Sequence, residues 1–311
     1  MSAPQFRQIE IVEVGPRDGL QSEPRVLPTG LKVEFVRGLA ASGLRRMEVA
    51  SFVNPKRVPQ MADAEDMFAA LAGEPNRSGF IGLVLNRKGF DRAVAAGCPE
   101  VGMAIAATES FSQRNQGCSL DEGIAAWLEI AAAAKTAGVR AQITLSTAFG
   151  CPFEGEVPVS RVLSIAERLA VANPQGEIAV ADTIGVAVPS QVTELVGALR
   201  SALPQVKWRA HFHNTRNTGL ANAYAAVEAG VRVLDASCGG IGGCPFAPAA
   251  TGNIPTEDLV YMLHRMGYDT GVDLPRLLDT SRWLQATLDH AVPGMLVKAG
   301  LFPATRKMEN A

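Results

Sequence analysis

Two histidines near residue 212 have the spacing that most directly indicates chemistry in this sequence. His211 and His213 end a strand-like segment over residues 206–210, and the 311-residue chain has only four histidines. On a β-strand, residues i and i+2 point to the same face, so both imidazoles can reach one metal ion. The alternative is that one histidine ends the strand while the other is solvated. Further ligand types elsewhere in the chain decide between these interpretations.

The elements that would position these histidines alternate regularly along the chain. Eight short apolar runs end near residues 14, 49, 84, 103, 145, 180, 213 and 236, and helical patterns separate them. Eight βα units without a break in composition predict an α/β fold, a single (β/α)8 TIM barrel. A doubly wound sheet with a small second domain is the alternative, disfavoured because no GxGxxG follows the first run. The predicted helices span residues 31–41, 64–71, 87–96, 120–137, 159–171, 191–203, 220–229 and 256–266.

Composition limits the classes of protein to which the chain can belong. The net charge of -2 offers no basic surface for nucleic acid, and no apolar run reaches the roughly 18 residues of a membrane-spanning helix. Residues 1–8 lack the apolar core of a signal peptide, and the five cysteines form no CxxC pair. We therefore expect a cytoplasmic protein without a structural zinc site. Residues 1–271 are predicted to form the barrel, and residues 272–311 a C-terminal helical extension packed on it, with one helix over 274–288.

Polar residues that follow the predicted strands are the candidate site, because TIM-barrel chemistry lies at the carboxyl ends of the strands. They offer carboxylates, a carboxamide and imidazoles, together with an arginine and a thiol. Oxygen-rich ligation with neutral imidazoles favours Mg²⁺ or Mn²⁺ over zinc. The candidates are Arg17, Asp18, Glu48, Asp182, His211, His213, Cys244 and Asn253.

Most of these candidates also have a purely structural interpretation. Asp18 and Asn253 can serve in turns, and Asp182 can cap the helix after the sixth strand. Glu48 can pair with an arginine, because an unpaired buried carboxylate is costly. Cys244 can be a small buried apolar residue, but the glycine-rich loop around it favours a functional thiol.

Long motifs, found in order along the chain, resemble those of the 3-hydroxy-3-methylglutaryl-CoA lyase family, metal-dependent carbon–carbon lyases on TIM barrels. The resemblance extends over roughly residues 9 to 277. The motifs are VEVGPRDGLQ (12–21), EVASFVNPK (48–56), VPQM (58–61), GCPFEG (150–155), DTIGV (182–186), GGCPF (242–246), GN (252–253) and TEDLVYML (256–263).

The resemblance implies a role for each candidate. The family cleaves 3-hydroxy-3-methylglutaryl-CoA to acetyl-CoA and acetoacetate. Asp18, His211, His213 and Asn253 fall on its metal ligands, Arg17 on its catalytic arginine, Cys244 on the cysteine of its mobile loop, and Glu48 and Asp182 on acidic residues beside the metal.

A retro-Claisen cleavage explains why these residue types are needed. A divalent cation would lower the pKa of the 3-hydroxyl, and either His211 or Asp182 would take its proton. Arg17 would stabilise the developing oxyanion, and Cys244 would protonate the enolate at carbon. The acyl-CoA substrate has no local sequence signature; Arg114 and Asn115, in the loop expected after the fourth strand, are the candidates for its phosphates.

Departures from the pattern of animal members leave the acyl group open. Asn214 and Arg216 stand where those members have Asp and Tyr, and Thr144 stands where an aromatic hydroxyl is expected. A related substrate such as citramalyl-CoA is the nearest alternative. We expect Asn214 and Arg216 to contact the acyl group and to determine which acyl-CoA is preferred. A Claisen-type synthase or a non-enzymatic binding barrel are further alternatives. We also expect a homo-oligomer, either a dimer or a tetramer.

Overall fold

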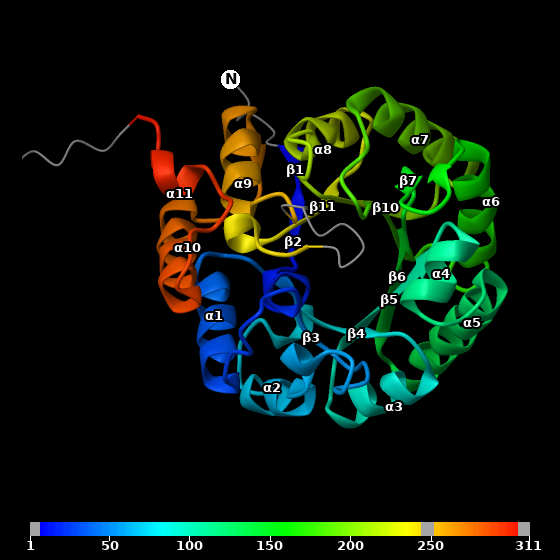
Figure 1. Cartoon of the computed structure of the whole chain (residues 1–311), viewed down its shortest axis with the longest axis horizontal. Helices are drawn as coiled ribbons and strands as arrows, with labels where there is room; N and C mark the ends of the chain where they lie inside the picture. The colour runs from blue at the N-terminus through cyan, green and yellow to red at the C-terminus, as the bar shows by residue number, and fades with distance from the viewer. Residues whose placement is uncertain (1–6, 244–251, 304–311) are drawn as a thin grey trace, which may run out of the picture.

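Eight parallel strands close into a barrel that helices surround (Figure 1). In this computed structural model, residues 7–243 and 252–303 are described. The predicted TIM barrel is confirmed, with the strand order β10-β11-β2-β3-β4-β5-β6-β9. The strands are β2 (Glu10–Glu13), β3 (Arg46–Ser51), β4 (Phe80–Val84), β5 (Glu100–Ala106), β6 (Arg140–Ser146), β9 (Glu177–Asp182), β10 (Lys207–Phe212) and β11 (Val233–Ala236).

The helices outside the barrel lie where the sequence pattern predicts them. α5 shows why: Ser119 and Glu122 form a capping box at its start, and Gly138, with φ of 67°, ends it. A short helix, α4 (Glu109–Asn115), replaces the loop expected after the fourth barrel strand. The other helices are α1 (Thr29–Ala41), α2 (Ala64–Ala70), α3 (Arg87–Ala95), α5 (Leu120–Ala137), α6 (Val159–Ala170), α7 (Pro189–Ala202), α8 (Gly219–Glu228) and α9 (Thr256–Arg265).

The inside of the barrel is apolar on one side and charged on the other. Val12, Val14, Ile81 and Val233 form a small buried cluster separate from the main core, which lies between strands and helices. Arg209, with no exposed surface, lies in a charged region that also includes carboxylates from neighbouring strands. Buried charges need partners, and Arg209 finds them in Glu177 and Asp235 on the neighbouring strands.

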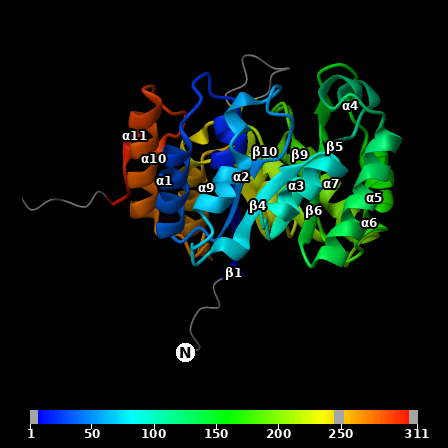
Figure 2. The same cartoon turned by 90° about the horizontal axis from the view of Figure 1, so that it is seen from below.

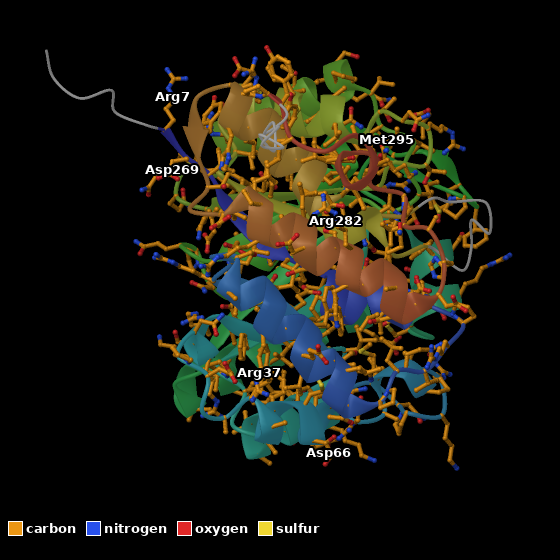
Figure 3. The ribbon with its side chains drawn as sticks, turned by 90° about the vertical axis from the view of Figure 1, so that its left-hand side faces the viewer. Arg7, Arg37, Asp66, Asp269, Arg282 and Met295 are labelled. Carbon is orange, nitrogen blue, oxygen red and sulfur yellow. The ribbon has the colours of Figure 1, made fainter. Side chains whose placement is uncertain are left out.

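Two further helices follow the barrel, α10 (Leu274–Leu288) and α11 (Leu296–Ala299). Figure 3 shows α10 lying beside α1, where the rings of Phe35 and Trp283 stack with centroids 6.1 Å apart. In side view, β1 (Arg7–Gln8) lies at the amino end of the barrel, where it pairs with β12 (Tyr268–Asp269) (Figure 2). Over the described residues, no helix combines the length and apolar character that crossing a membrane requires.

Candidate active site

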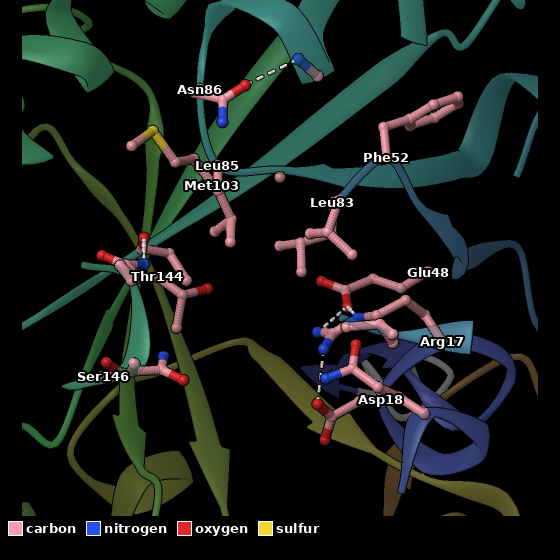
Figure 4. A pocket seen from close by; sticks show the side chains of 18 of the residues that line it. Arg17, Asp18, Glu48, Phe52, Leu83, Leu85, Asn86, Met103, Thr144 and Ser146 are labelled. Carbon is pink, nitrogen blue, oxygen red and sulfur yellow. Dashed lines mark hydrogen bonds and ion pairs between the residues drawn. The ribbon is translucent and has the colours of Figure 1, made fainter. Parts of the chain in front are cut away.

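A cavity of about 920 Å³ opens at the carboxyl ends of the barrel strands. Figure 4 shows Arg17, Asp18 and Glu48 on one side of it, with Thr144 and Ser146 on the other. The apolar part of the wall comes from β3 to β5 and the segments that follow them, and includes Phe52, Leu83, Leu85 and Met103. The cavity therefore combines a polar end with an apolar wall, as sites for small organic ligands generally do.

A single π-helical turn, Gly15–Gly19, presents the first two candidate residues. The amides of Arg17, Asp18 and Gly19 all donate to the carbonyl of Val14, which coils the chain tightly at the end of β2. The buried carboxylate of Glu13 accepts from the amide of Gly15 at 2.7 Å. A Cβ atom on Gly15 would lie only 2.6 Å from that carboxylate, so a larger residue would displace Glu13 from this hydrogen bond.

Glu48 and Asp18 hold the guanidinium of Arg17 on the cavity wall. Nε of Arg17 donates to Oε2 of Glu48 at 2.7 Å, and its Nη2 donates to the same oxygen. Its Nη1 donates to Oδ1 of Asp18 at 2.6 Å. The arginine partner that the structural interpretation of Glu48 required is thus Arg17, the predicted catalytic arginine. Glu48 fixes the direction in which the planar fork points.

Asp18 and the two histidines converge as the spacing of residues 211 and 213 predicts. One potential ligand atom from each of Asp18, His211 and His213 lies within 4.8 Å of the others. Burial raises the pKa of Asp18, but Arg17 and both histidines outweigh it and lower that pKa to about 2. Burial and then the neighbouring His211 lower the pKa of His213 to about 3. At neutral pH this places an ionised carboxylate beside a neutral imidazole, the forms that bind a cation.

Asn253 reaches this cluster because its segment inserts beside the ends of β10 and β11. Asn253 forms an isolated β-bridge with His213, and Pro255 forms one with Ser237. Nδ2 of Asn253 donates to Oδ2 of Asp18 at 2.9 Å and to the carbonyl of Ile241 at 3.1 Å. No strand pattern in the sequence indicates this insertion.

The residues present fit a divalent cation. Oδ1 of Asn253 and Nδ1 of His213 are both buried, and neither has a hydrogen-bond partner within the described ranges. Buried polar atoms without partners are rare and commonly face an ion or water. A carboxylate, an amide oxygen and neutral imidazoles suit Mg²⁺ or Mn²⁺.

Asp182 does not line this cavity among the described residues. Its carboxylate accepts from the amides of Val186 at 2.9 Å and Ala187 at 3.0 Å, and so holds the loop after β9. Burial raises its pKa, although these two hydrogen bonds lower it. The carboxylate of Asp182 is thus used by this loop, and its catalytic role stays a prediction.

Asn214 and Arg216, predicted to contact the acyl group, both make hydrogen bonds to neighbouring backbone. Oδ1 of Asn214 accepts from the amide of Gly219 at the start of α8. Nη1 of Arg216 donates to the carbonyls of Ile184 and Gly185, at 3.1 and 2.8 Å. Neither residue lines the cavity in the part of the chain that is described. Arg216 thus binds the loop after β9 and Asn214 binds the first residue of α8, uses that the sequence pattern does not reveal.

The remaining predicted residues divide between the cavity and its surroundings. Asn115 lines the cavity, whereas Arg114 lies in α4 with its guanidinium carbon 4.2 Å from the centroid of the Phe153 ring. Exposed Arg57 and Lys88, which sequence reasoning did not select, line the cavity instead. Cys244 lies outside the described residues.

Sequence reasoning also missed the residues beneath the histidines. Asp235 in β11 is 3% exposed, and its Oδ2 lies 3.1 Å from Nδ1 of His211. Burial lowers the pKa of His211, but the hydrogen bond and charge of Asp235 outweigh this and raise it. The sequence did contain a signal for Arg209, because Arg209, His211 and His213 alternate along one strand and so share a face.

The chain is similar to known proteins over nearly its whole length. Residues 8–284 match the family model described as HMGL-like. The (R)-citramalyl-CoA lyase of Chloroflexus aurantiacus is 42% identical, covering 94% of this chain and 95% of that relative. The hydroxymethylglutaryl-CoA lyase of Pseudomonas mevalonii is 40% identical, over 97% and 98%. The structure of an HMG-CoA lyase from Acinetobacter baumannii, in complex with coenzyme A and 3-methylmalate, superposes with a TM-score of 0.91 at 38% identity, over 98% of both chains.

Proposed function

The chain belongs to the HMGL-like family, and on this premise we propose that it is a divalent-metal-dependent lyase that cleaves the C2–C3 bond of a tertiary 3-hydroxyacyl-CoA. The observation that carries the proposal is the convergence of Asp18, His211 and His213, with Asn253 beside them, at the polar end of the cavity. We propose 3-hydroxy-3-methylglutaryl-CoA as the substrate, giving acetyl-CoA and acetoacetate.

The proposed reaction removes the proton of the 3-hydroxyl and then breaks the C2–C3 bond. When bound by Asp18, His211, His213 and Asn253, Mg²⁺ or Mn²⁺ polarises the hydroxyl and lowers its pKa. Asp182 is turned toward its own loop, and His211 would use one ring nitrogen on the cation and the other on Asp235, so Asp18 is the described candidate for accepting the proton. The hydroxyl oxygen becomes the carbonyl oxygen of the released oxo acid, and the bond electrons pass to C2.

Arg17 is assigned to the negative charge that arrives on the thioester oxygen. Its guanidinium lies on the cavity wall, and Glu48 fixes its orientation. A fixed, charged donor at a developing oxyanion stabilises the transition state more than the ground state. The resulting enolate takes a proton at C2 to give acetyl-CoA. That step is assigned to Cys244, on the basis of the family resemblance of its loop.

The coenzyme A part is assigned to the side of the cavity formed by β3 to β5. Exposed Arg57 and Lys88 are placed to meet phosphates, and Asn115 offers a polar contact. Arg114, the other sequence candidate, stacks on Phe153 instead. An apolar wall between these cations and the metal ligands suits a thioester-linked chain.

Citramalyl-CoA is a second candidate substrate. It differs from 3-hydroxy-3-methylglutaryl-CoA by lacking one methylene between the carbinol carbon and the carboxylate, and its cleavage gives pyruvate. The specific observation in its favour is the 42% identity to the (R)-citramalyl-CoA lyase. The chemistry assigned to Asp18, Arg17 and the histidines is the same for both.

The experiment is a direct test with both thioesters. Purified protein is stripped of metal with a chelator, resupplied with Mg²⁺ or Mn²⁺, and incubated with each acyl-CoA. Mass spectrometry should show acetyl-CoA together with acetoacetate or pyruvate, only after metal is returned. Full activity in the stripped protein would refute the metal's role, and release of free coenzyme A without acetyl-CoA would refute carbon–carbon cleavage.

A further inference from the structure

The polar side of the barrel interior continues directly below the metal ligands. Register pairs Arg209 with Val233 and Ala210 with Leu234, so the next position along β10 and β11 brings His211 beside Asp235. One carboxylate oxygen of Asp235 bonds His211, and the other lies 3.3 Å from Nε of Arg209. Asp235 thus joins a predicted ligand to a buried cation.

Arg209 is held from several sides. Its Nη2 donates to Oε1 of Gln142 at 2.8 Å and to Oγ1 of Thr144 at 3.2 Å, and its Nη1 lies 3.2 Å from Oε1 of Glu177. It has no exposed surface and is not among the described residues that line the cavity. Arg209 therefore acts on the site only through its neighbours.

Small residues on adjacent strands make room for these side chains. Arg209 pairs with Ala179 of β9, and a Cβ atom on Gly102 would lie 2.6 Å from Nε2 of Gln142. A large apolar residue at either position would fill the space that Arg209 and Gln142 occupy. The small residues Ala179 and Gly102 thus leave space inside the barrel for the side chains of Arg209 and Gln142.

We propose that Asp235 and Arg209 form a positioning pair that orients the His211 ring for metal binding. The proposal rests on the proposed function, because it concerns the same metal site. Asp235 accepts from Nδ1 of His211, which turns the other ring nitrogen toward Asp18 and His213. The positive charge of Arg209, whose Nε lies 3.3 Å from the other carboxylate oxygen, attracts that oxygen and so favours the orientation of Asp235 that faces the ring. Neither residue belongs to the proposed set of metal ligands.

The alternative is that the pair only stabilises the barrel. Loss of a buried charge partner is destabilising wherever it occurs, so stability alone cannot separate the two roles. Metal affinity can separate them, because Arg46 offers a matched control. Arg46 is also a mostly buried arginine that pairs with Glu177, but it has no contact with Asp235 among the described residues.

The experiment measures Mn²⁺ affinity of the metal-stripped full chain by calorimetry, without substrate. Asp235→Asn, which keeps the side-chain volume, should weaken the Kd by about 10- to 100-fold. Arg209→Met should weaken it at least about threefold. Arg46→Met should leave it unchanged while lowering the melting temperature to a similar extent.

A double variant gives the sharper result. Because Arg209 acts through Asp235, Arg209→Met should have no further effect on the Kd once Asp235→Asn is present. Additive effects, or an unchanged Kd in folded Asp235→Asn, would overturn the inference while leaving the proposed lyase function standing. Arg209→Lys serves where Arg209→Met does not fold, and it should retain part of the affinity. A wild-type protein that binds no Mn²⁺ would overturn both proposals together.

Discussion

Replacing Arg17 by lysine tests the site most directly, because the structure specifies what the guanidinium does. Three of its nitrogens make contacts, two to Glu48 and one to Asp18, and its side chain is 13% exposed. A lysine ammonium is a point charge on a flexible stem and cannot hold both carboxylates in the same geometry. The variant keeps the charge but loses the aligned fork.

The magnitude follows from the loss of an oriented donor. Removing one preorganised donor from a developing oxyanion costs about 3 to 4 kcal/mol, which corresponds to roughly a 100- to 1000-fold loss in kcat. The KM for acyl-CoA should change little, since the thioester oxygen carries little charge in the ground state. Metal affinity should stay near that of the wild type, because Asp18 retains its contact with Asn253.

The assay is steady-state release of acetyl-CoA, with kcat and KM measured separately and Mn²⁺ affinity measured on the same preparations. Arg37→Lys is the matched control, because Arg37 is an exposed arginine that pairs with Glu74. A kcat for Arg17→Lys within about fivefold of wild type would refute the oxyanion role, since that is below the expected cost of one lost donor.

Three further predictions concern stability, binding and the loop after β9. Burial raises the pKa of Glu177, but Arg209 and then Arg46 outweigh it and lower that pKa from 4.5 to about 2. The stabilisation of about 3 kcal/mol is therefore present above pH 4.5 and lost toward pH 2. Urea unfolding should show that the deficit of Glu177→Gln relative to wild type shrinks over this range; a pH-independent deficit would contradict it. Lys88→Ala should raise the KM for acyl-CoA about fivefold at low salt and less at high salt, whereas Lys135→Ala, at the opposite end of the barrel, should not. Asp182→Asn should lower the free energy of unfolding by about 1 to 2 kcal/mol and leave kcat near that of the wild type; a large loss of kcat in the folded variant would restore the proton-accepting role predicted from sequence.

Local patterns in the sequence were sufficient to predict the barrel. The predicted helix over residues 120–137 begins at a capping box and ends at a glycine. Parallel strands that are buried on both faces are visible in the sequence as continuous apolar runs. His211 and His213 were also found from sequence, because the alternation of a single strand decides that they share a face. These features depend on near neighbours in the chain.

Only the tertiary structure decided which candidates meet. Asp182, Asn214 and Arg216 have the right residue types near strand ends, yet Asp182 and Arg216 bind the loop after β9 and Asn214 binds the first residue of α8. The direction in which a side chain points at a strand end is set by its contacts rather than by its residue type. Asn253 and Asp235 reach the histidines through strand insertion and register, which join segments distant in sequence.

The sequence by itself determined the barrel, the paired histidines and the chemical types of the ligands, because hydrophobic period and residue chemistry are local properties. The closed barrel decided that Arg17 lies between Glu48 and Asp18, and that Arg209 lies beneath Asp235. A buried charge must find its partner wherever the fold brings one within reach, and only the closed barrel fixes which side chains those are.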